Sequence, residues 1–215
     1  MQEVHALLML TAVFAVALVS PGPDVALVVR TSLHQGRRAG VLSALGLASG
    51  ILVHGTLVLT GVSLLLSRSP LLFNALQLVG AAYLGWLGIG ALRALRKPGG
   101  AGRIDGELSA SKLGPWLRGL ATNLFNPKAL VFFLALLTSL IPVDMSVPGK
   151  VSVAAMLFVI GFAWFSLLSI LLTRPLWQRR LLRAVPAIDG ACGVVFLLVA
   201  GGILFSVVNH ATHWV

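Results

Sequence analysis

The stretch Val151–Leu172 reads VSVAAMLFVIGFAWFSLLSILL and contains no charged residue. It is long enough to cross the hydrocarbon core of a bilayer as one α-helix, which needs about 20 apolar residues. It lacks the strict alternation of a barrel strand, so a helix is the spanning structure that satisfies its backbone. Five further stretches have this character, and the sequence predicts an all-α membrane protein with six transmembrane helices. These helices are expected at Val4–Val29, Ala39–Leu66, Leu71–Leu92, Leu117–Ile141, Val151–Leu172 and Ile188–Val208.

The composition favours a protein embedded in lipid rather than a soluble enzyme. Of the 215 residues, 58% are hydrophobic and 10% are charged, whereas soluble domains carry about 25% charged residues. The single cysteine, Cys192, excludes an internal disulfide. His210 and His213 lack further ligands nearby in the sequence, and no phosphate-binding loop occurs. We therefore expect no metal site, no cofactor and no enzymatic activity.

The net charge of +10 fits either nucleic-acid binding or the excess of Lys and Arg in cytoplasmic loops. The basic residues gather in three connections on one side of a six-helix protein, and only Arg68 and Lys150 lie on the other side. We expect these connections in the cytoplasm, both termini outside it, and no nucleic-acid partner. The basic residues of the connections are Arg30, Arg37, Arg38, Arg93, Arg96, Lys97, Arg103, Lys112, Arg118, Arg174, Arg179, Arg180 and Arg183.

The segment Pro98–Lys112, PGGAGRIDGELSASK, is rich in Gly and Ser and predicts a flexible cytoplasmic linker. It separates residues 1–97 from residues 113–215, and each part holds three predicted helices. Because three is odd, the second part would enter the membrane upside down, which predicts an inverted repeat. A proline followed by a charge recurs at Pro23–Asp24 and Pro127–Lys128, in the first helix of each part.

The residues Ser20, Pro21, Gly22, Pro23 and Asp24 predict a break in the first helix. Each proline lacks an N–H, and its ring crowds the carbonyl four residues earlier. Carbonyls freed in hydrocarbon must face protein, water or a ligand. A carboxylate at this depth is expected to face the bundle interior or an aqueous cavity. The alternative is a structural kink with Asp24 near the cytoplasmic boundary.

Asn123 and the sequence Asn126–Pro127–Lys128 predict a second break, in the fourth helix. Pro127 frees the carbonyl of Asn123, and two amides and an ammonium lie in an otherwise apolar helix. Together the two breaks suit a zwitterion and indicate a transport site. Asp24 would hold a substrate ammonium or a coupling proton, while Lys128, Asn123 and Asn126 would orient a carboxylate. The alternative is a buried ion pair between Asp24 and Lys128 that holds the two parts together.

Other residues are secondary candidates. His54 is a candidate for proton coupling, or else a packing residue. Asp189 is a candidate gate or coupling carboxylate, or else a charge that suits a helix N-terminus. Four glycines are expected to allow close helix packing, within the protomer or in a homo-oligomer. They are Gly46, Gly50, Gly80 and Gly85.

Several motifs recur in a characteristic order: Ser20–Asp24, Gly36–Gly40 followed by Gly46 and Gly50, Gly80–Gly85, and Asn126–Lys128. In these motifs the chain resembles the lysine exporter/homoserine-threonine resistance (LysE/RhtB) family of bacterial amino-acid exporters. The resemblance implies a six-helix secondary exporter in the bacterial cytoplasmic (inner) membrane. It implies amino acids or their derivatives as substrates, with threonine and homoserine favoured, exchanged for protons. The alternative is a small-ion or metal exporter on a similar inverted repeat, for which the sequence offers few ligands.

Overall fold

The computed structural model describes residues 2–95, 113–142 and 145–212. In these ranges the chain is helical and has no strand, which confirms the predicted all-α class. The predicted linker, residues 98–112, lies outside the described residues. The helices are α1 (Gln2–Val19), α2 (Pro23–Arg68), α3 (Pro70–Ala94), α4 (Pro115–Leu124), α5 (Pro127–Leu140), α6 (Val147–Leu171) and α7 (Pro175–Thr212).

The helix α2 consists of two helical segments joined by a turn at Gly36. This residue has φ 83° and ψ 171°, a backbone conformation that glycine adopts readily because it has no Cβ. The chain turns back here, as the contact between Ser32 Oγ and Gly40 shows. On an unbroken helix these two residues would be separated by about 12 Å. The predicted connection between Val29 and Ala39 is therefore wrong in extent, since both flanking segments stay helical up to Gly36.

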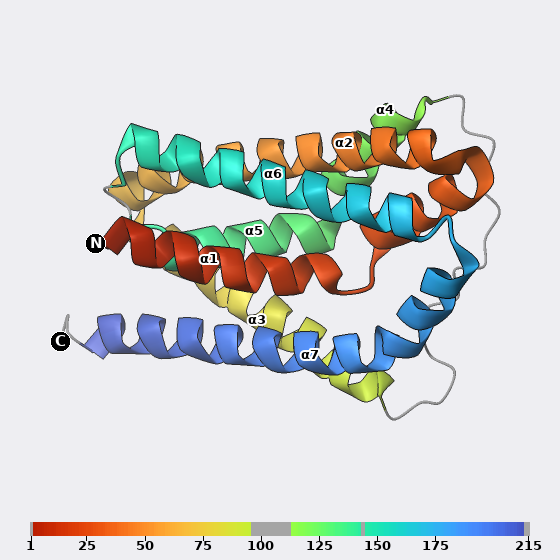
Figure 1. The fold of residues 1–215 in the computed structure, drawn as a ribbon. Helices are drawn as coiled ribbons and strands as arrows, with labels where there is room; N and C mark the ends of the chain where they lie inside the picture. Colours follow the sequence, from red (N-terminus) through yellow and green to blue (C-terminus); the bar gives the residue numbers. More distant parts are fainter. Residues whose placement is uncertain (1, 96–112, 143–144, 213–215) are drawn as a thin grey trace.

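The helix α7 begins at Pro175 rather than at the predicted Ile188, and it contains Pro186. Its first turns run at an angle to the remainder of the helix (Figure 1). Several arginines expected in a connection therefore lie on a helix instead. Figure 1 also places the start of α1 and the end of α7 at one end of the bundle, and the turn within α2 at the opposite end.

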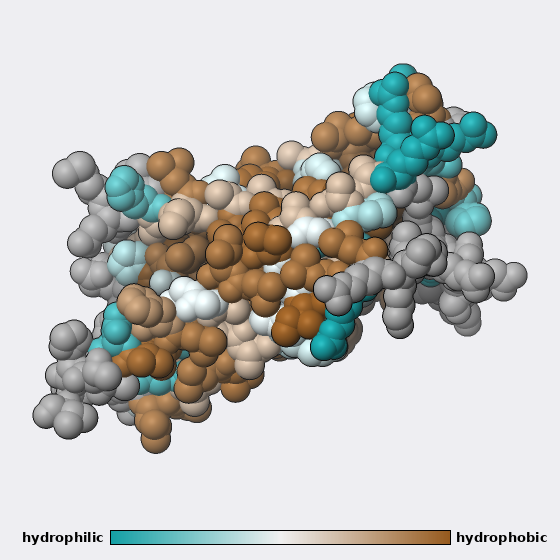
Figure 2. Space-filling model, turned by 90° about the horizontal axis from the view of Figure 1, so that it is seen from below, coloured by the Kyte–Doolittle hydropathy of each residue, from teal (hydrophilic) through white to brown (hydrophobic). Residues whose placement is uncertain are grey.

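Four helical stretches of the described residues are long and apolar enough to cross a membrane. The helices α4 and α5 are bent by 58° at their junction and make a fifth span if they cross together. Figure 2 shows an extended apolar surface on one side of the bundle, with hydrophilic residues gathered toward its ends. A multi-pass architecture follows, whereas the sixth span and the inverted repeat remain predictions. The four stretches are Pro23–Gly61, Leu71–Ala94, Val147–Leu171 and Arg183–Asn209.

Close packing of α2 against α4 depends on glycines. A Cβ at Gly46 would overlap the carbonyl oxygen of Trp116, and a Cβ at Gly119 would overlap that of Ser43. Both obstacles are backbone atoms, which cannot move aside as the end of a side chain can. The two helix axes can therefore approach this closely only because neither position carries a side chain.

The other predicted packing glycines differ in how close their neighbours are. A Cβ at Gly50 of α2 would lie 2.6 Å from Asn123 Oδ1 of α4, and a Cβ at Gly80 of α3 would lie 2.6 Å from Ala135 Cβ of α5. A Cβ at Gly85 would make only an ordinary contact, at 4.0 Å from another methyl group. Gly50 therefore borders the residue that carries one of the site's amides.

We predict that Gly46→Ala lowers the thermal stability of the purified protein. The added methyl group meets backbone, and overpacking of this kind costs about 1–3 kcal/mol. Gly61→Ala on the same helix is the matched control, because a Cβ there has no atom within 4 Å. The melting temperature in detergent, followed by tryptophan fluorescence, is the measurement. Equal melting temperatures for the two variants would contradict the packing described for α2 and α4.

Candidate functional site

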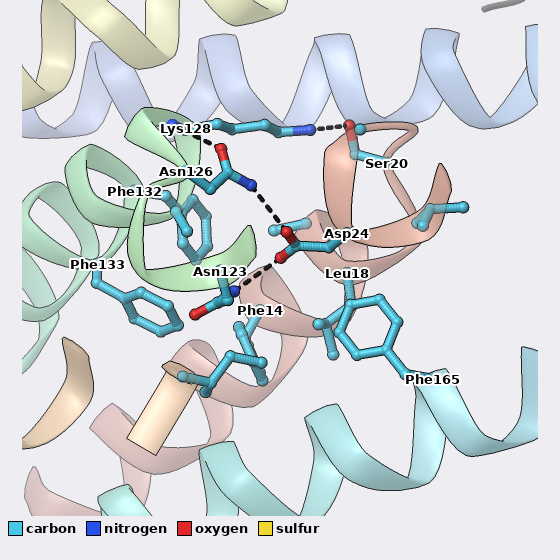
Figure 3. A pocket seen from close by; sticks show the side chains of 15 residues that line it. Phe14, Leu18, Ser20, Asp24, Asn123, Asn126, Lys128, Phe132, Phe133 and Phe165 are labelled. Atoms are coloured by element: carbon cyan, nitrogen blue, oxygen red, sulfur yellow. Dashed lines mark hydrogen bonds between the residues drawn. The ribbon is translucent and has the colours of Figure 1, made fainter. Parts of the chain in front are cut away.

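The two predicted helix breaks meet inside the bundle. After the first break α2 restarts at Pro23, and after the second α5 restarts at Pro127. Proline suits the first turn of a helix, because the N–H that it lacks has no helical partner there. The next residues, Asp24 and Lys128, therefore occupy corresponding positions at the two restarts. Figure 3 shows these side chains beside one cavity.

Asp24 is held by the two amides of the second break. Asn123 Nδ2 donates to Asp24 Oδ2 at 2.7 Å, and Asn126 Nδ2 donates to Oδ1 at 3.1 Å. Each carboxylate oxygen thus has its own donor, from a residue about a hundred positions later in the chain. Asp24 also lies in the first turn of α2, where the helix dipole favours a negative charge.

Lys128 is held by the first break. Its Nζ donates to Ser20 Oγ at 2.8 Å and to the carbonyl oxygen of Pro21 at 3.2 Å. Gly22 leaves room for this side chain, since a Cβ there would lie 3.6 Å from Nζ. Although both residues lie in the described part of the chain, Lys128 and Asp24 do not form an ion pair. Each charge instead binds neutral groups of the opposite break.

Asn126 connects the restart of α5 to the carboxylate. Its Oδ1 accepts a hydrogen bond from the backbone N–H of Lys128 at 3.0 Å, which makes it the N-cap of α5. Its Nδ2 is then directed to Asp24. Because the amide has one oxygen and one nitrogen, the helix cap determines which end faces the carboxylate. The need to cap the start of α5 therefore orients the Asn126 amide toward Asp24.

The backbone of Asn123 contacts the imidazole of His54 in α2. His54 Nε2 lies 3.2 Å from the carbonyl oxygen of Asn123, the oxygen whose usual helical donor is absent in Pro127. The imidazole is buried and stacks on Phe133, with 5.9 Å between ring centroids. His54 does not line the cavity, and its contacts with residues of the site are those with the Asn123 backbone and Phe133.

The helix α7 covers the Lys128 side of the site. The ring of Phe196 lies 5.9 Å from Lys128 Nζ, within the range of a cation–π contact. Cys192 Sγ donates to the carbonyl oxygen of Val16 at 3.3 Å. Asp189, one turn earlier on the same helix and partly exposed, is close enough to interact electrostatically with Lys128. The predicted candidates Asp189 and His54 thus lie on different sides of the site.

The polar groups border a cavity of about 60 Å³. A water molecule needs about 10–15 Å³ in this measure, so the cavity has room for a few waters. The sequence did not indicate its apolar walls, although Phe132 and Phe133 follow Lys128 by one helical turn. Among the described residues, no group of three or more His, Cys, Asp or Glu side chains could hold a metal ion. The apolar walls consist of Phe14, Ala17, Leu18, Val25, Ile51, Ala129, Phe132, Phe133 and Phe165.

We predict that Asn126→Asp destabilises the protein and that adding Asp24→Asn restores part of the loss. Aspartate keeps an oxygen for the α5 cap but places a second carboxylate against Asp24. The double variant again pairs an amide with a carboxylate, in the reverse direction. A hydrogen bond to a charged group contributes about 1.5–3 kcal/mol. Melting temperatures of the wild type, both single variants and the double variant give the coupling, and additive losses would contradict the contact.

The chain is similar to a protein family and to many known proteins, among them three efflux proteins. The sequence model of the LysE type translocator family matches residues 15–206. The threonine efflux protein of Escherichia coli (strain K12) is 30% identical over 185 residues, which are 86% of this chain and 90% of that protein. The leucine efflux protein of Klebsiella pneumoniae is 34% identical over 151 residues, which are 69% of this chain and 70% of that protein. The homoserine/homoserine lactone efflux protein of Salmonella typhimurium is 42% identical over 120 residues, which are 54% of this chain and 55% of that protein. No solved structure matches significantly.

The family match includes both helix breaks and the helices between them. It confirms the resemblance that the proline, glycine and asparagine motifs indicate, and it confirms the prediction of a multi-pass transporter rather than an enzyme. The chain belongs to the LysE type translocator family.

Proposed function

We propose that this protein exports amino acids or their derivatives from the cytoplasm, with threonine-like and homoserine-like substrates favoured. One observation carries the proposal. Asp24 and Lys128 border the same cavity and are each held by neutral groups, not by one another. The names of the relatives, which include threonine, leucine and homoserine efflux proteins, support the substrate class.

The hydrogen bonds of the site suit the binding and release of a zwitterion. The substrate ammonium binds Asp24, and the substrate carboxylate binds Lys128. A carboxylate adds a Coulomb attraction to the ammonium of Lys128 that the neutral acceptors Ser20 and Pro21 lack. The carboxylate can therefore replace the Ser20 hydroxyl and the Pro21 carbonyl at Lys128 Nζ. Asn123 and Asn126 keep the Asp24 carboxylate in place, since their amide nitrogens already bind it.

Asp24 also offers a route to exchange with protons. After the substrate has left, a proton on Asp24 neutralises a carboxylate that lies in an apolar bundle, where a lone charge is costly. The site then returns to the cytoplasmic side without substrate, and proton antiport follows. His54 supports the second break in this scheme. Asp189 gates the site on the Lys128 side.

The same arrangement supports six spans in two inverted parts. The helix α1 and the first segment of α2, up to Gly36, form one broken span that corresponds to α4 and α5. Pro23–Asp24 and Pro127–Lys128 occupy matching positions at the two restarts. The arginines beside Gly36 and those at the start of α7 indicate the cytoplasmic end. We propose a bacterial inner-membrane protein with both termini outside the cytoplasm.

We predict that Asp24→Asn and Lys128→Gln each reduce export of labelled threonine or homoserine by at least about tenfold, the effect of losing one charge-assisted hydrogen bond. The measurement is uptake into inside-out membrane vesicles at matched protein levels. Lys150→Gln is the matched control, because Lys150 lines a separate groove between α2 and α6. Full export by the double variant Asp24→Asn, Lys128→Gln would refute the assigned site.

We predict that alkaline phosphatase fused after Val215 is active in bacterial cells, since this enzyme matures only outside the cytoplasm. The same reporter inserted within residues 98–112 should be inactive. Green fluorescent protein at the same two positions is the control and should give the opposite pattern. An inactive phosphatase with a fluorescent protein at the C-terminus would show that the proposed orientation is inverted.

A further inference from the structure

We propose that Phe165 determines which side chains the site accepts, and that its substrates are neutral amino acids with short side chains. This inference rests on the proposed export function. It concerns the part of the cavity that lies beyond Asp24 and Lys128. That part is formed by aromatic and aliphatic side chains from four helices, α1, α2, α5 and α6. A bound amino acid that uses both charges places its side chain against these walls.

The charges of the cavity indicate a neutral side chain. Among the residues that the structure describes, Asp24 and Lys128 are the only ionisable side chains that line it, and the α-ammonium and α-carboxylate of the substrate use both. A third charge on the substrate would lie against hydrocarbon without a partner, which is costly. For a cation, attraction to the face of an aromatic ring offsets only part of the cost of burying the charge. The cavity lining therefore offers no third charge partner to the side chain of a basic or acidic amino acid.

The size of the cavity indicates a short side chain. Its volume of about 60 Å³ has room for only a few waters. Two of its walls on opposite sides (Figure 3) are the fully buried rings of Phe133 and Phe165, each 2% exposed. A longer side chain would have to displace one of these rings.

Three of the four aromatic walls are fixed by one another. The ring centroids of Phe14 and Phe133 are 5.8 Å apart, those of Phe14 and Phe132 are 6.4 Å apart, and those of Phe132 and Phe133 are 5.7 Å apart. Such pairs contribute more than their buried area alone. Changing one of these rings would therefore disturb the other two, together with the helices α1 and α5 that carry them.

Phe165 differs from this cluster in its origin and its contacts. It comes from α6, and among the described residues no aromatic ring packs against it. Figure 3 shows its ring beside Leu18 and Asp24, on the side of the cavity away from Phe132 and Phe133. A substitution here changes the cavity without removing a contact of the aromatic cluster. Phe165 is therefore the aromatic wall whose size can set side-chain selectivity without changing the cluster of Phe14, Phe132 and Phe133.

The test compares Phe165→Ala and Phe165→Trp with a matched control, Phe162→Ala. Phe162 lies on the same helix, stacks on Phe158 with 6.2 Å between centroids, and does not line the cavity. Inside-out vesicles take up labelled threonine in competition with unlabelled threonine, leucine, phenylalanine or lysine. The readout is the ratio of inhibition constants between competitors, which a uniform loss of folded protein leaves unchanged. Phe165→Leu replaces the alanine variant if the latter does not fold.

Phe165→Ala should favour leucine and phenylalanine over threonine by at least about tenfold relative to wild type, the selectivity associated with one methylene in an apolar pocket. Phe165→Trp should shift the same ratios in the opposite direction, and Phe162→Ala should leave them unchanged. Lysine should compete poorly in every variant. Parallel changes for all competitors, or lysine as effective as threonine, would overturn this inference alone. Wild-type vesicles that take up no amino acid would overturn the proposed function and this inference together.

Discussion

The structure depends on a requirement imposed by lipid: polar groups at an interrupted helix must find partners inside the protein. This chain interrupts two helices and lets each interruption satisfy the other. The second break supplies Asn123 and Asn126 to Asp24, and the first break supplies Ser20 and the Pro21 carbonyl to Lys128. Four hydrogen bonds between segments far apart in sequence thus join the two parts of the bundle at its centre.

Close helix packing makes these contacts possible. Because Gly46 and Gly119 have no side chains, the backbones of α2 and α4 come into direct contact at these positions. This approach brings Gly50 and His54 against Asn123, so that the amide faces Asp24. The Asn123 carbonyl, which accepts from the Asn126 N–H, also faces the imidazole. A small loss of closeness between α2 and α4 would therefore lengthen the hydrogen bonds at the site as well as weaken the packing.

The choice of neutral partners has a functional consequence. A direct ion pair between Asp24 and Lys128 would neutralise both charges and would have to be broken for each substrate molecule. Amides, a hydroxyl and a carbonyl hold the charges in place while leaving them available for ionised groups of a ligand. The translocator family of the chain and a cavity bordered by both charges fit this arrangement. When a zwitterion binds, Asp24 and Lys128 each gain an ionised partner of opposite charge.

The sequence by itself determined the helical class, the proline breaks and the pairing of a charge with each break. These features follow from covalent chemistry, because proline lacks an N–H wherever it lies and a long apolar run needs a helix in lipid. The sequence could not decide the partners. Asp24 binds two amides instead of Lys128, Gly36 alone forms a turn predicted to span Arg30–Arg38, and Phe165 borders the cavity from a distant helix. Only tertiary packing decides the partners of Asp24 and the wall formed by Phe165, since these features join residues about a hundred or more positions apart whose approach depends on how the helices pack.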